Sequence, residues 1–354
     1  MSLSHFLHKV ADTYNQLITL AIKEYRNPVK VGFSTRINLI RKGFLSDKAV
    51  LYNTKDYKYN EYLSDYQRFV KSIKINNKYR LLLDQKVVFN HIMANYYQYL
   101  AQEFGEINEG KIQLYYQKRK AADIQSLVEL IDKEKKIVIK PQEGGEGTGI
   151  MVIQTLQDKI LVNKKEYTLI GFGKLIQQLD KCLITQYVHQ ADYSSQIYSE
   201  TLNTIRILTM RNPESNETFI ATAVHRFGSD ASFPVDNWTN GGFSVSIDVD
   251  SGILGKAVTY PKKGKLNWLD KHPDTNSQIE GVTISNWEKV KTTILDIASN
   301  FPLCNYIGWD IAITKDNIKI IEGNSYSGVN IFQVHKPLLI DPKVKSFYKY
   351  YNVV

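Results

Sequence analysis

Short apolar segments rich in β-branched residues recur along the chain from residue 136 onward. Runs of this kind, bounded by turn-forming residues, are typical of β-strands. We expect strands at Ile137–Lys140, Ile150–Ile153, Cys182–Val188, Thr204–Met210, Phe219–Phe227, Phe243–Val249, Gly308–Thr314 and Ile318–Glu322. Apolar residues at helical spacing predict helices at Ala122–Lys133, Gly173–Asp180 and Trp287–Ser299. The pattern therefore predicts a mixed α+β protein.

The first 83 residues follow a different pattern. Apolar residues at helical spacing predict an opening helix, at Leu3, Phe6, Leu7, Val10, Tyr14, Leu17, Ile18 and Ala21. This stripe fits packing on the helix's own domain, and a membrane-surface or partner-binding helix is the alternative. A tyrosine-rich stretch without clear periodicity follows at Lys55–Tyr79, so we expect a separate N-terminal lobe over residues 1–83. Asp84 then fits the N-cap of a further helix that includes Lys86.

Composition and charge narrow the classes of protein. Hydrophobic residues make up 43% and charged residues 23% of the 354 positions, which is ordinary for a globular protein. The formal net charge of +9 permits nucleic acid, but the sequence has no zinc-finger spacing or RNA-binding aromatic signature, so we expect no nucleic-acid partner. No apolar run is long enough for a membrane span. Cys182 and Cys304 show no metal-binding spacing, and a reducing cytoplasm fits best.

Two acidic residues oppose each other in a predicted β-hairpin. Two apolar runs between Gly308 and Asn324 are joined by Lys-Asp-Asn, which indicates a hairpin with a three-residue loop. A loop of this length pairs Ala312 with Ile320 and Asp310 with Glu322. Side chains alternate along a strand, so Asn324 points to the same side of the sheet as Glu322.

Opposed carboxylates in neighbouring strands repel each other, so we expect a cation between them. Two carboxylates and an amide offer oxygen ligands only, and such ligands suit Mg²⁺, with Mn²⁺ as a possible substitute. The predicted metal ligands are Asp310, Glu322 and Asn324. The alternative is that a lysine or arginine bridges the two acids, or that one acid is protonated.

A glycine-rich loop follows a lysine that lies on a predicted strand. After Lys140, the segment Pro-Gln-Glu-Gly-Gly-Glu-Gly-Thr-Gly ends at Gly149 and precedes another strand. Glycines let backbone N–H groups approach phosphate oxygens closely, and the lysine adds positive charge for the same phosphates. A plain flexible hairpin is the alternative. The loop lacks the Gly-Lys-Ser/Thr ending of a P-loop, and neither kinase motifs nor a dinucleotide-binding helix follow it.

The order of these features resembles the ATP-grasp superfamily over residues 84–328. Within this region four segments resemble the sugar-transfer-associated ATP-grasp family: Asn203–Thr209, Val235–Gly242, Lys271–Asp274 and the hairpin from Gly-Trp-Asp to Glu-Gly-Asn. The resemblance implies an ATP-grasp fold of the α+β class. Two α+β subdomains, at 84–188 and 189–354, would grip ATP beside the smaller N-terminal lobe.

The resemblance also implies roles in nucleotide binding. Lys86 and Lys140 would contact the phosphates, although Gln85 interrupts the Asp-Lys pair that is usual at the first of these positions. The loop would cover the triphosphate through Gly144, Gly145, Gly147 and Thr148. The strand that ends with Gln186, Tyr187 and Val188 would bind adenine, with Gln186 where a glutamate is usual, and Asp192 would contact the ribose.

Two arginines would complete the site. Arg206 lies inside an apolar strand, where an unpaired guanidinium is costly to bury, so it requires an anion. By resemblance, Arg206 and Arg226 would face the γ-phosphate or the substrate carboxylate, and a structural salt bridge is the alternative for each. His225 alternates to the opposite face from Arg226 and is expected to be a packed histidine.

Taken together, the resemblance implies an ATP-dependent carboxylate–amine ligase that acts through an acyl phosphate. The implied substrates are a small-molecule carboxylate and an amine, with a sugar acid of surface polysaccharide or glycoconjugate assembly as the candidate acceptor. Two alternatives remain at this stage. One is an ATP-grasp phosphotransferase (kinase) that acts on a hydroxyl, and the other is a non-catalytic nucleotide-binding protein.

Overall fold

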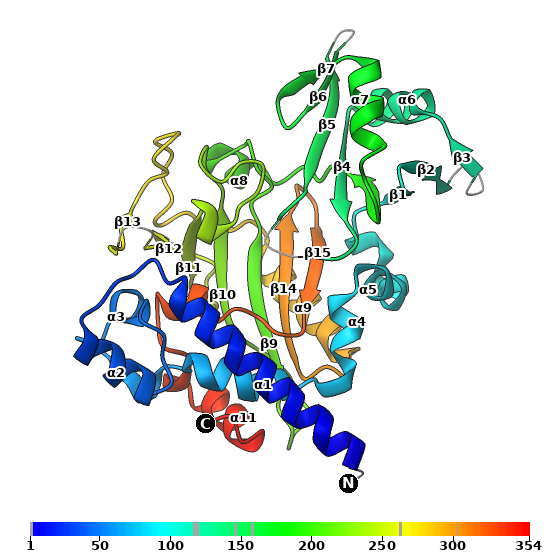
Figure 1. Ribbon diagram of the computed structural model, residues 1–354. Coiled ribbons are helices and arrows are strands. Elements are labelled where there is room, and N and C mark those ends of the chain that lie inside the picture. The colour runs from blue at the N-terminus through cyan, green and yellow to red at the C-terminus, as the bar shows by residue number, and fades with distance from the viewer. Residues whose placement is uncertain (1–2, 116–119, 145–146, 157–158, 262–263, 302) are drawn as a thin grey trace.

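Two antiparallel β-sheets organise the molecule. The computed structural model describes residues 3–115, 120–144, 147–156, 159–261, 264–301 and 303–354. An eight-stranded sheet has the order β3-β2-β1-β8-β4-β5-β6-β7, and a seven-stranded sheet has the order β13-β12-β11-β10-β9-β14-β15. In Figure 1 the eight-stranded sheet lies at the top and right, the seven-stranded sheet lies in the middle, and the N-terminal helix α1 runs across the lower part of the view.

The eight-stranded sheet has its own core. Its strands are β1 (Glu103–Asn108), β2 (Lys111–Leu114), β3 (Lys120–Ala122), β4 (Lys136–Pro141), β5 (Met151–Leu156), β6 (Lys159–Val162), β7 (Lys165–Tyr167) and β8 (Cys182–Gln186). Helices α6 (Ile124–Glu134) and α7 (Leu169–Ile176) pack against it through Leu127, Ile131 and Phe172. Helix α7 begins earlier than predicted, because Thr168 caps it by accepting a hydrogen bond from the Gly171 backbone N–H.

The seven-stranded sheet forms the centre of the molecule. Its strands are β9 (Ile205–Arg211), β10 (Thr218–Phe227), β11 (Phe243–Ile247), β12 (Leu254–Thr259), β13 (Trp268–Leu269), β14 (Tyr306–Ile313) and β15 (Ile318–Asn324). Helix α9 (Trp287–Ser299) covers one face through Trp287 and Ile294, and short helix α8 (Asp192–Ile197) contributes Ile197 to the same core.

The N-terminal segment covers the other face of this sheet and does not form a separate lobe. It contains α1 (Leu3–Tyr25), α2 (Phe33–Arg41) and α3 (Lys48–Leu51). Leu39 and Tyr62 share one core with Leu208 of β9 and with Phe347 of the C-terminal helix α11 (Pro342–Tyr350). The tyrosine-rich stretch lacks periodicity because it consists of short turns, whose side chains fill gaps against the sheet.

Further short helices connect the larger elements. Helix α10 spans Asn330–Gln333, and a single π-helical turn spans Gln67–Lys71. Short 3₁₀ segments occur at Tyr59–Glu61, Ser72–Lys74, Asn77–Arg80, Met93–Tyr99, Trp238–Asn240 and Leu338–Ile340. Among the helices in the described ranges, none is both long and apolar enough to cross a lipid bilayer.

The helix that carries Lys86 packs on the seven-stranded sheet. Helices α4 (Leu81–Asp84) and α5 (Lys86–Ile92) contribute Leu83 and Phe89 to the core that contains β14 and β15. Gln85 occupies the N-cap position of α5, so the prediction for Asp84 is wrong. The Asp84 carboxylate instead accepts hydrogen bonds from the backbone N–H and the hydroxyl of Ser325, at 3.2 and 2.8 Å.

Candidate functional site

The β14–β15 hairpin places Asp310 opposite Glu322, as the sequence predicts. The register near the turn differs from the prediction, because Ala312 pairs with Lys319 and Ile313 pairs with Ile318. Ile321 is the extra residue in β15, and it forms a β-bulge that restores the pairing of Asp310 with Glu322. The bulge thus compensates for a turn that is one residue longer than expected.

Two arginines neutralise Asp310. Arg206 pairs directly with Asp310 across neighbouring strands, and its guanidinium donates two hydrogen bonds to the carboxylate, each at 2.5 Å. Arg226 Nη2 lies 3.0 Å from the other side of the same carboxylate. Burial alone raises the pKa of Asp310, but the two guanidinium groups outweigh it and lower the pKa to about 2. Asp310 is therefore an anion. Arg206 Nη2 also lies 3.8 Å from Glu322 Oε1, so an arginine bridges the two acids, as the alternative interpretation of the pair stated.

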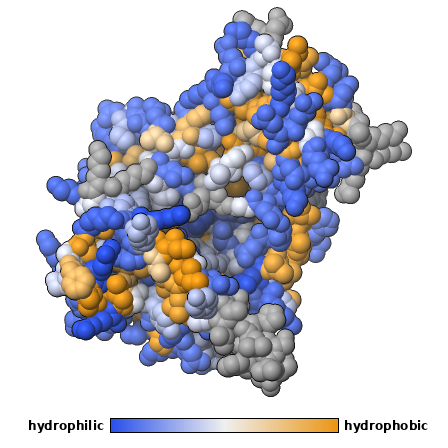
Figure 2. Space-filling model, in the orientation of Figure 1, coloured by the Kyte–Doolittle hydropathy of each residue, from blue (hydrophilic) through white to orange (hydrophobic). Residues whose placement is uncertain are grey.

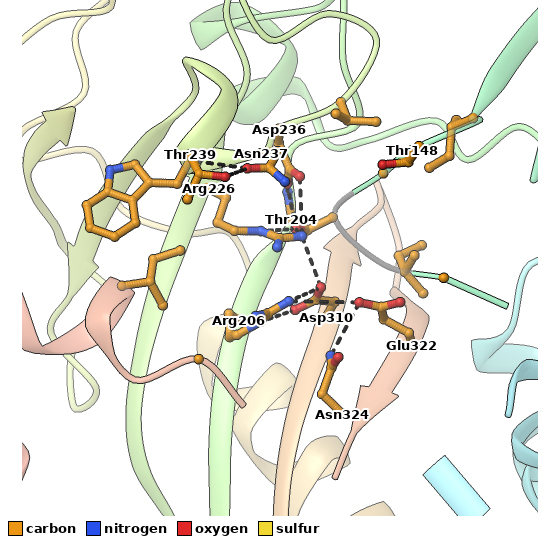
Figure 3. A pocket seen from close by; sticks show the side chains of 18 of the residues that line it. Thr148, Thr204, Arg206, Arg226, Asp236, Asn237, Thr239, Asp310, Glu322 and Asn324 are labelled. Carbon is orange, nitrogen blue, oxygen red and sulfur yellow. Dashed lines mark hydrogen bonds and ion pairs between the residues drawn. The ribbon is translucent and has the colours of Figure 1, made fainter. Parts of the chain in front are cut away.

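Glu322 and Asn324 face the open side of this cluster (Figure 3). Glu322 shares a hydrogen bond with Asp310, and burial together with the Asp310 charge raises the pKa of Glu322. Asn324 Nδ2 lies 3.3 Å from Glu322 Oε1 and 3.2 Å from the Gly308 carbonyl oxygen. The Glu322 side chain is 30% exposed, against 3% for Asp310, so Glu322 is the acid that can reach a ligand.

A second polar network supports Arg226. Asp236 accepts hydrogen bonds from the backbone N–H and the hydroxyl of Thr204, at 2.8 and 2.6 Å, and lies 3.2 Å from Arg226 Nη2. The Thr204 hydroxyl oxygen in turn accepts hydrogen bonds from Arg226. Sequence reasoning gave neither Thr204 nor Asp236 a role. The one feature of the sequence that could have indicated a role for Asp236 is its place inside the segment Val235–Gly242, which resembles the family.

His225 takes no part in this cluster, in agreement with the prediction. It is 1% exposed, and its Nε2 lies 3.0 Å from the hydroxyl of Tyr193. Burial lowers the pKa of His225 to about 3, so the ring is neutral.

Lys140 and Lys86 approach the cluster from different elements. Lys140 lies near the end of β4, and burial together with the charge of Lys86 lowers its pKa. In the described part of the chain, no carboxylate lies within 4 Å of Lys140 Nζ. Lys86 Nζ donates to the Gly144 carbonyl oxygen at 3.2 Å, which links α5 to the glycine-rich loop. Both ammonium groups thus lie beside the loop without a carboxylate partner.

A cavity of about 1000 Å³ joins these groups and receives residues from both sheets. The predicted site residues that line it are Lys86, Lys140, Gly144, Gly147, Thr148, Gln186, Tyr187, Val188, Arg206, Arg226, Asp310, Glu322 and Asn324. Asp192 begins α8 and does not line the cavity, whereas Glu200, which the sequence did not single out, does. Gly145 lies outside the described residues. Figure 2 shows the hollow in this face of the molecule, flanked by hydrophilic residues.

The glycine-rich loop reaches across to the other side of the cavity. Gly147 has φ of +74°, and a Cβ atom there would lie 2.7 Å from a methyl group of Val235. Only glycine combines this backbone conformation with such a close approach. The loop therefore touches the segment that carries Asp236.

Comparison with known families agrees with this geometry. A sequence model of the family described as sugar-transfer associated ATP-grasp matches residues 65–347. The chain belongs to this family. The match runs from Asp65 to Phe347 and so includes every strand of both sheets. A comparison with curated proteins gave no match.

Solved structures similar to this ATP-grasp protein include a ligase and two synthetases. A D-alanine–D-alanine ligase from Bacillus anthracis is 13% identical, with 83% of this chain and 78% of that chain covered and a TM-score of 0.37. D-alanyl-alanine synthetase A from Vibrio cholerae is 10% identical, with coverages of 77% and 63% and a TM-score of 0.43. An N5-carboxyaminoimidazole ribonucleotide synthetase, solved with ADP, is 11% identical, with a TM-score of 0.37. The match covers 75% of this chain but only 48% of the length of that synthetase. These sequence identities and TM-scores are too low to assign the roles of residues in those enzymes to residues of this chain.

Proposed function

We propose that this ATP-grasp protein binds MgATP in the cavity and uses it to activate a carboxylate. The observation that carries the proposal is the opposed pair of Asp310 and Glu322, with Asn324, at the wall of a cavity that also contains two lysines. A triphosphate would neutralise the unpaired ammonium groups, and Glu322 with Asn324 offers oxygen ligands to its metal ion.

The nucleotide roles follow from position in the cavity. Lys140 and Lys86 would hold the phosphates, since each presents an ammonium group beside the glycine-rich loop. The end of β8 at Gln186 would bind adenine, because its backbone lies at the cavity wall between the two sheets. Glu200 is better placed than Asp192 for the ribose, since only Glu200 lines the cavity.

The residues present fit a divalent metal ion. In the described ranges, no group of three or more His, Cys, Asp or Glu side chains could hold a metal ion. The proposed site therefore relies on two acids and an amide. Glu322 is the more exposed of the two acids, and burial together with the Asp310 charge raises its pKa; a cation beside it would favour its ionised form. Mg²⁺, with Mn²⁺ as a substitute, would be held by Glu322, Asn324 and Asp310 and would supply charge neutralisation for the phosphates.

The chemistry proposed is a two-step ligation. A carboxylate oxygen of the acceptor attacks the γ-phosphorus of ATP, the bond to the bridging oxygen breaks, and ADP leaves. An amine then attacks the acyl carbon, phosphate leaves and the nitrogen loses a proton. Arg226 and Arg206 would stabilise the charge that develops on the transferred phosphoryl group, because both guanidinium groups line the cavity beside Asp310.

Three parts of the proposal go beyond the family assignment. The gripping units are the two subdomains 84–188 and 189–354, although residues 84–99 pack on the second sheet. The proposed acceptor is a sugar acid of surface polysaccharide or glycoconjugate assembly, and the family's association with sugar transfer supports only the sugar part of this proposal. The cytoplasm is the proposed location, since it supplies ATP and both cysteines are free thiols.

Product analysis tests the proposal. Purified protein is incubated with MgATP, a panel of uronic acids and a mixture of amino acids, and ADP and amide are measured. Formation of both supports ligation, whereas ADP with a phosphate ester would identify a phosphotransferase. ADP formation should be lost in Asp310→Asn and Lys140→Ala. Failure of every acceptor pair to yield ADP, in protein that binds nucleotide, would favour a non-catalytic nucleotide-binding protein.

A further inference from the structure

The cavity continues past the acid pair into the N-terminal segment. At this end it is lined by Lys23, Arg26, Lys48, Arg68 and Tyr326. The proposed nucleotide contacts use none of these residues. They lie on the side of the seven-stranded sheet that the N-terminal segment covers.

Arg68 is held in a fixed orientation at this end. Its guanidinium carbon lies 4.2 Å from the ring centroids of both Phe69 and Tyr326, and the two rings meet at 76°, so the cation lies in the corner between two aromatic rings. Nε and Nη2 donate to the backbone carbonyl oxygens of Ser327 and Tyr326, at 3.3 and 3.4 Å. These residues follow the candidate metal ligand Asn324 by three and two positions. Arg68 is therefore positioned beside the proposed phosphoryl-transfer centre.

The positive charge at this end exceeds the negative charge. The carboxylates of Asp47 and Asp65 both pair with the buried Lys48, at 2.7 and 2.9 Å. A third carboxylate that lines the cavity, of Asp84, accepts hydrogen bonds from Ser325. For Lys23, Arg26 and Arg68, no carboxylate in the described residues lies within 4 Å. A cleft that is lined mainly by positive charges attracts an anion.

A buried hydroxyl group also lacks a partner here. Tyr326 Oη is inaccessible to solvent and forms no hydrogen bond with any described residue. Leaving a buried hydroxyl unpaired is unfavourable. A molecule in the cavity can reach this hydroxyl only if the side chains that cover it move, so the hydroxyl by itself does not indicate a ligand. It belongs to the ring that Arg68 contacts.

We infer that this end of the cavity is the acceptor subsite, and that Arg68 binds a second anionic group of the acceptor. This inference rests on the proposed function. The acceptor is then a sugar acid with two anionic groups, one carboxylate activated at the acid pair and one carboxylate or phosphate held by Arg68. An arginine fork suits either group, because it offers parallel donors to two oxygens.

Calorimetric titration with three probes tests the inference. The protein is loaded with Mg²⁺ and a non-hydrolysable ATP analogue, and is titrated with glucuronic acid, glucuronic acid 1-phosphate and glucaric acid. The first probe carries one anionic group, the second adds a phosphate and the third adds a carboxylate. We expect the better of the two probes with two anionic groups to bind about tenfold more tightly than glucuronic acid, because one additional charge-assisted hydrogen bond contributes about that much affinity.

Arg68→Gln should abolish this preference while binding of glucuronic acid changes less than about twofold. Glutamine keeps an N–H donor for the backbone carbonyls, and unchanged affinity for the ATP analogue will show that the fold is retained. Arg41→Gln is the matched control, because Arg41 is an exposed arginine of α2 that does not line the cavity. An unchanged preference in Arg68→Gln, or no preference in the wild type, overturns the inference. Loss of analogue binding in the wild type would instead refute the proposed function.

Discussion

Replacing Asp310 with asparagine removes the charge that Arg206 and Arg226 share, and its cost can be worked from the structure. The pKa of Asp310 is about 2, against an ordinary value of 3.8. At about 1.4 kcal/mol per pKa unit, this difference corresponds to roughly 2.5 kcal/mol of stability at neutral pH. The side chain is 3% exposed, so solvent screening reduces the figure little. At roughly 2.1 cal/mol/K of unfolding entropy per residue over 354 residues, we expect Asp310→Asn to lower the melting temperature by about 3 to 4 °C.

The pH dependence gives this prediction a distinct sign. Because the folded-state pKa of Asp310 is lowered, its contribution is fully present above the unfolded-state pKa and is lost as pH falls through about 2. The difference between wild type and Asp310→Asn should therefore stay constant from pH 8 to pH 5. Near pH 3 it should fall to about half.

Thermal unfolding of both proteins across this pH range checks the reasoning. Asp316→Asn is the matched control, because Asp316 is an exposed aspartate in the turn of the same hairpin. It should leave the melting temperature unchanged within about 1 °C. The electrostatic account is refuted if Asp310→Asn destabilises no more than this control, or if its effect does not shrink in acid.

Three further predictions concern other parts of the fold. Glu322→Gln should raise the melting temperature of the nucleotide-free protein at pH 7. Because the folded-state pKa of Glu322 is raised, its contribution to stability is full below the unfolded-state pKa and is lost as pH rises through the folded-state pKa, so the gain should vanish near pH 4. Gly147→Ala should weaken MgATP binding about tenfold by calorimetry, since the new methyl group would meet Val235 and strain the backbone, whereas Gly32→Ala, in open space, should not. Lys48→Met should lower the unfolding free energy by about 3 to 5 kcal/mol in urea titrations, because two buried carboxylates lose their cation; an effect no larger than that of the exposed Lys30→Met would contradict this.

The hairpin with the acid pair could be predicted because its information is local. Alternation along two strands and a short turn place Asp310 opposite Glu322, and the β-bulge left that pair intact. The salt bridge to Arg206 could not be predicted, because β9 and β14 are about a hundred residues apart and become neighbours only in the assembled sheet. The sequence showed only that Arg206 required an anion.

Several strands were missed because their turns carry unusual residues. Strands β1 and β2 are joined by Glu109 and Gly110, and β6 and β7 by Asn163 and Lys164, all with positive φ. Two-residue turns of this geometry favour Asn-Gly, so Glu-Gly and Asn-Lys give weak signals. The role of Asp84 was missed for a different reason, since its partner Ser325 lies 241 residues away.

Metal-dependent nucleotide binding tests the central claim most directly. ATP is titrated calorimetrically into the wild type and into Glu322→Gln, each in Mg²⁺ and in EDTA. We predict that the wild type binds ATP at least tenfold more tightly in Mg²⁺ than in EDTA, and that Glu322→Gln loses most of this difference, because Glu322 is the exposed acid of the site. Equal affinity in Mg²⁺ and EDTA, or the same metal dependence in the variant, would contradict the assignment of Asp310, Glu322 and Asn324 as the metal site.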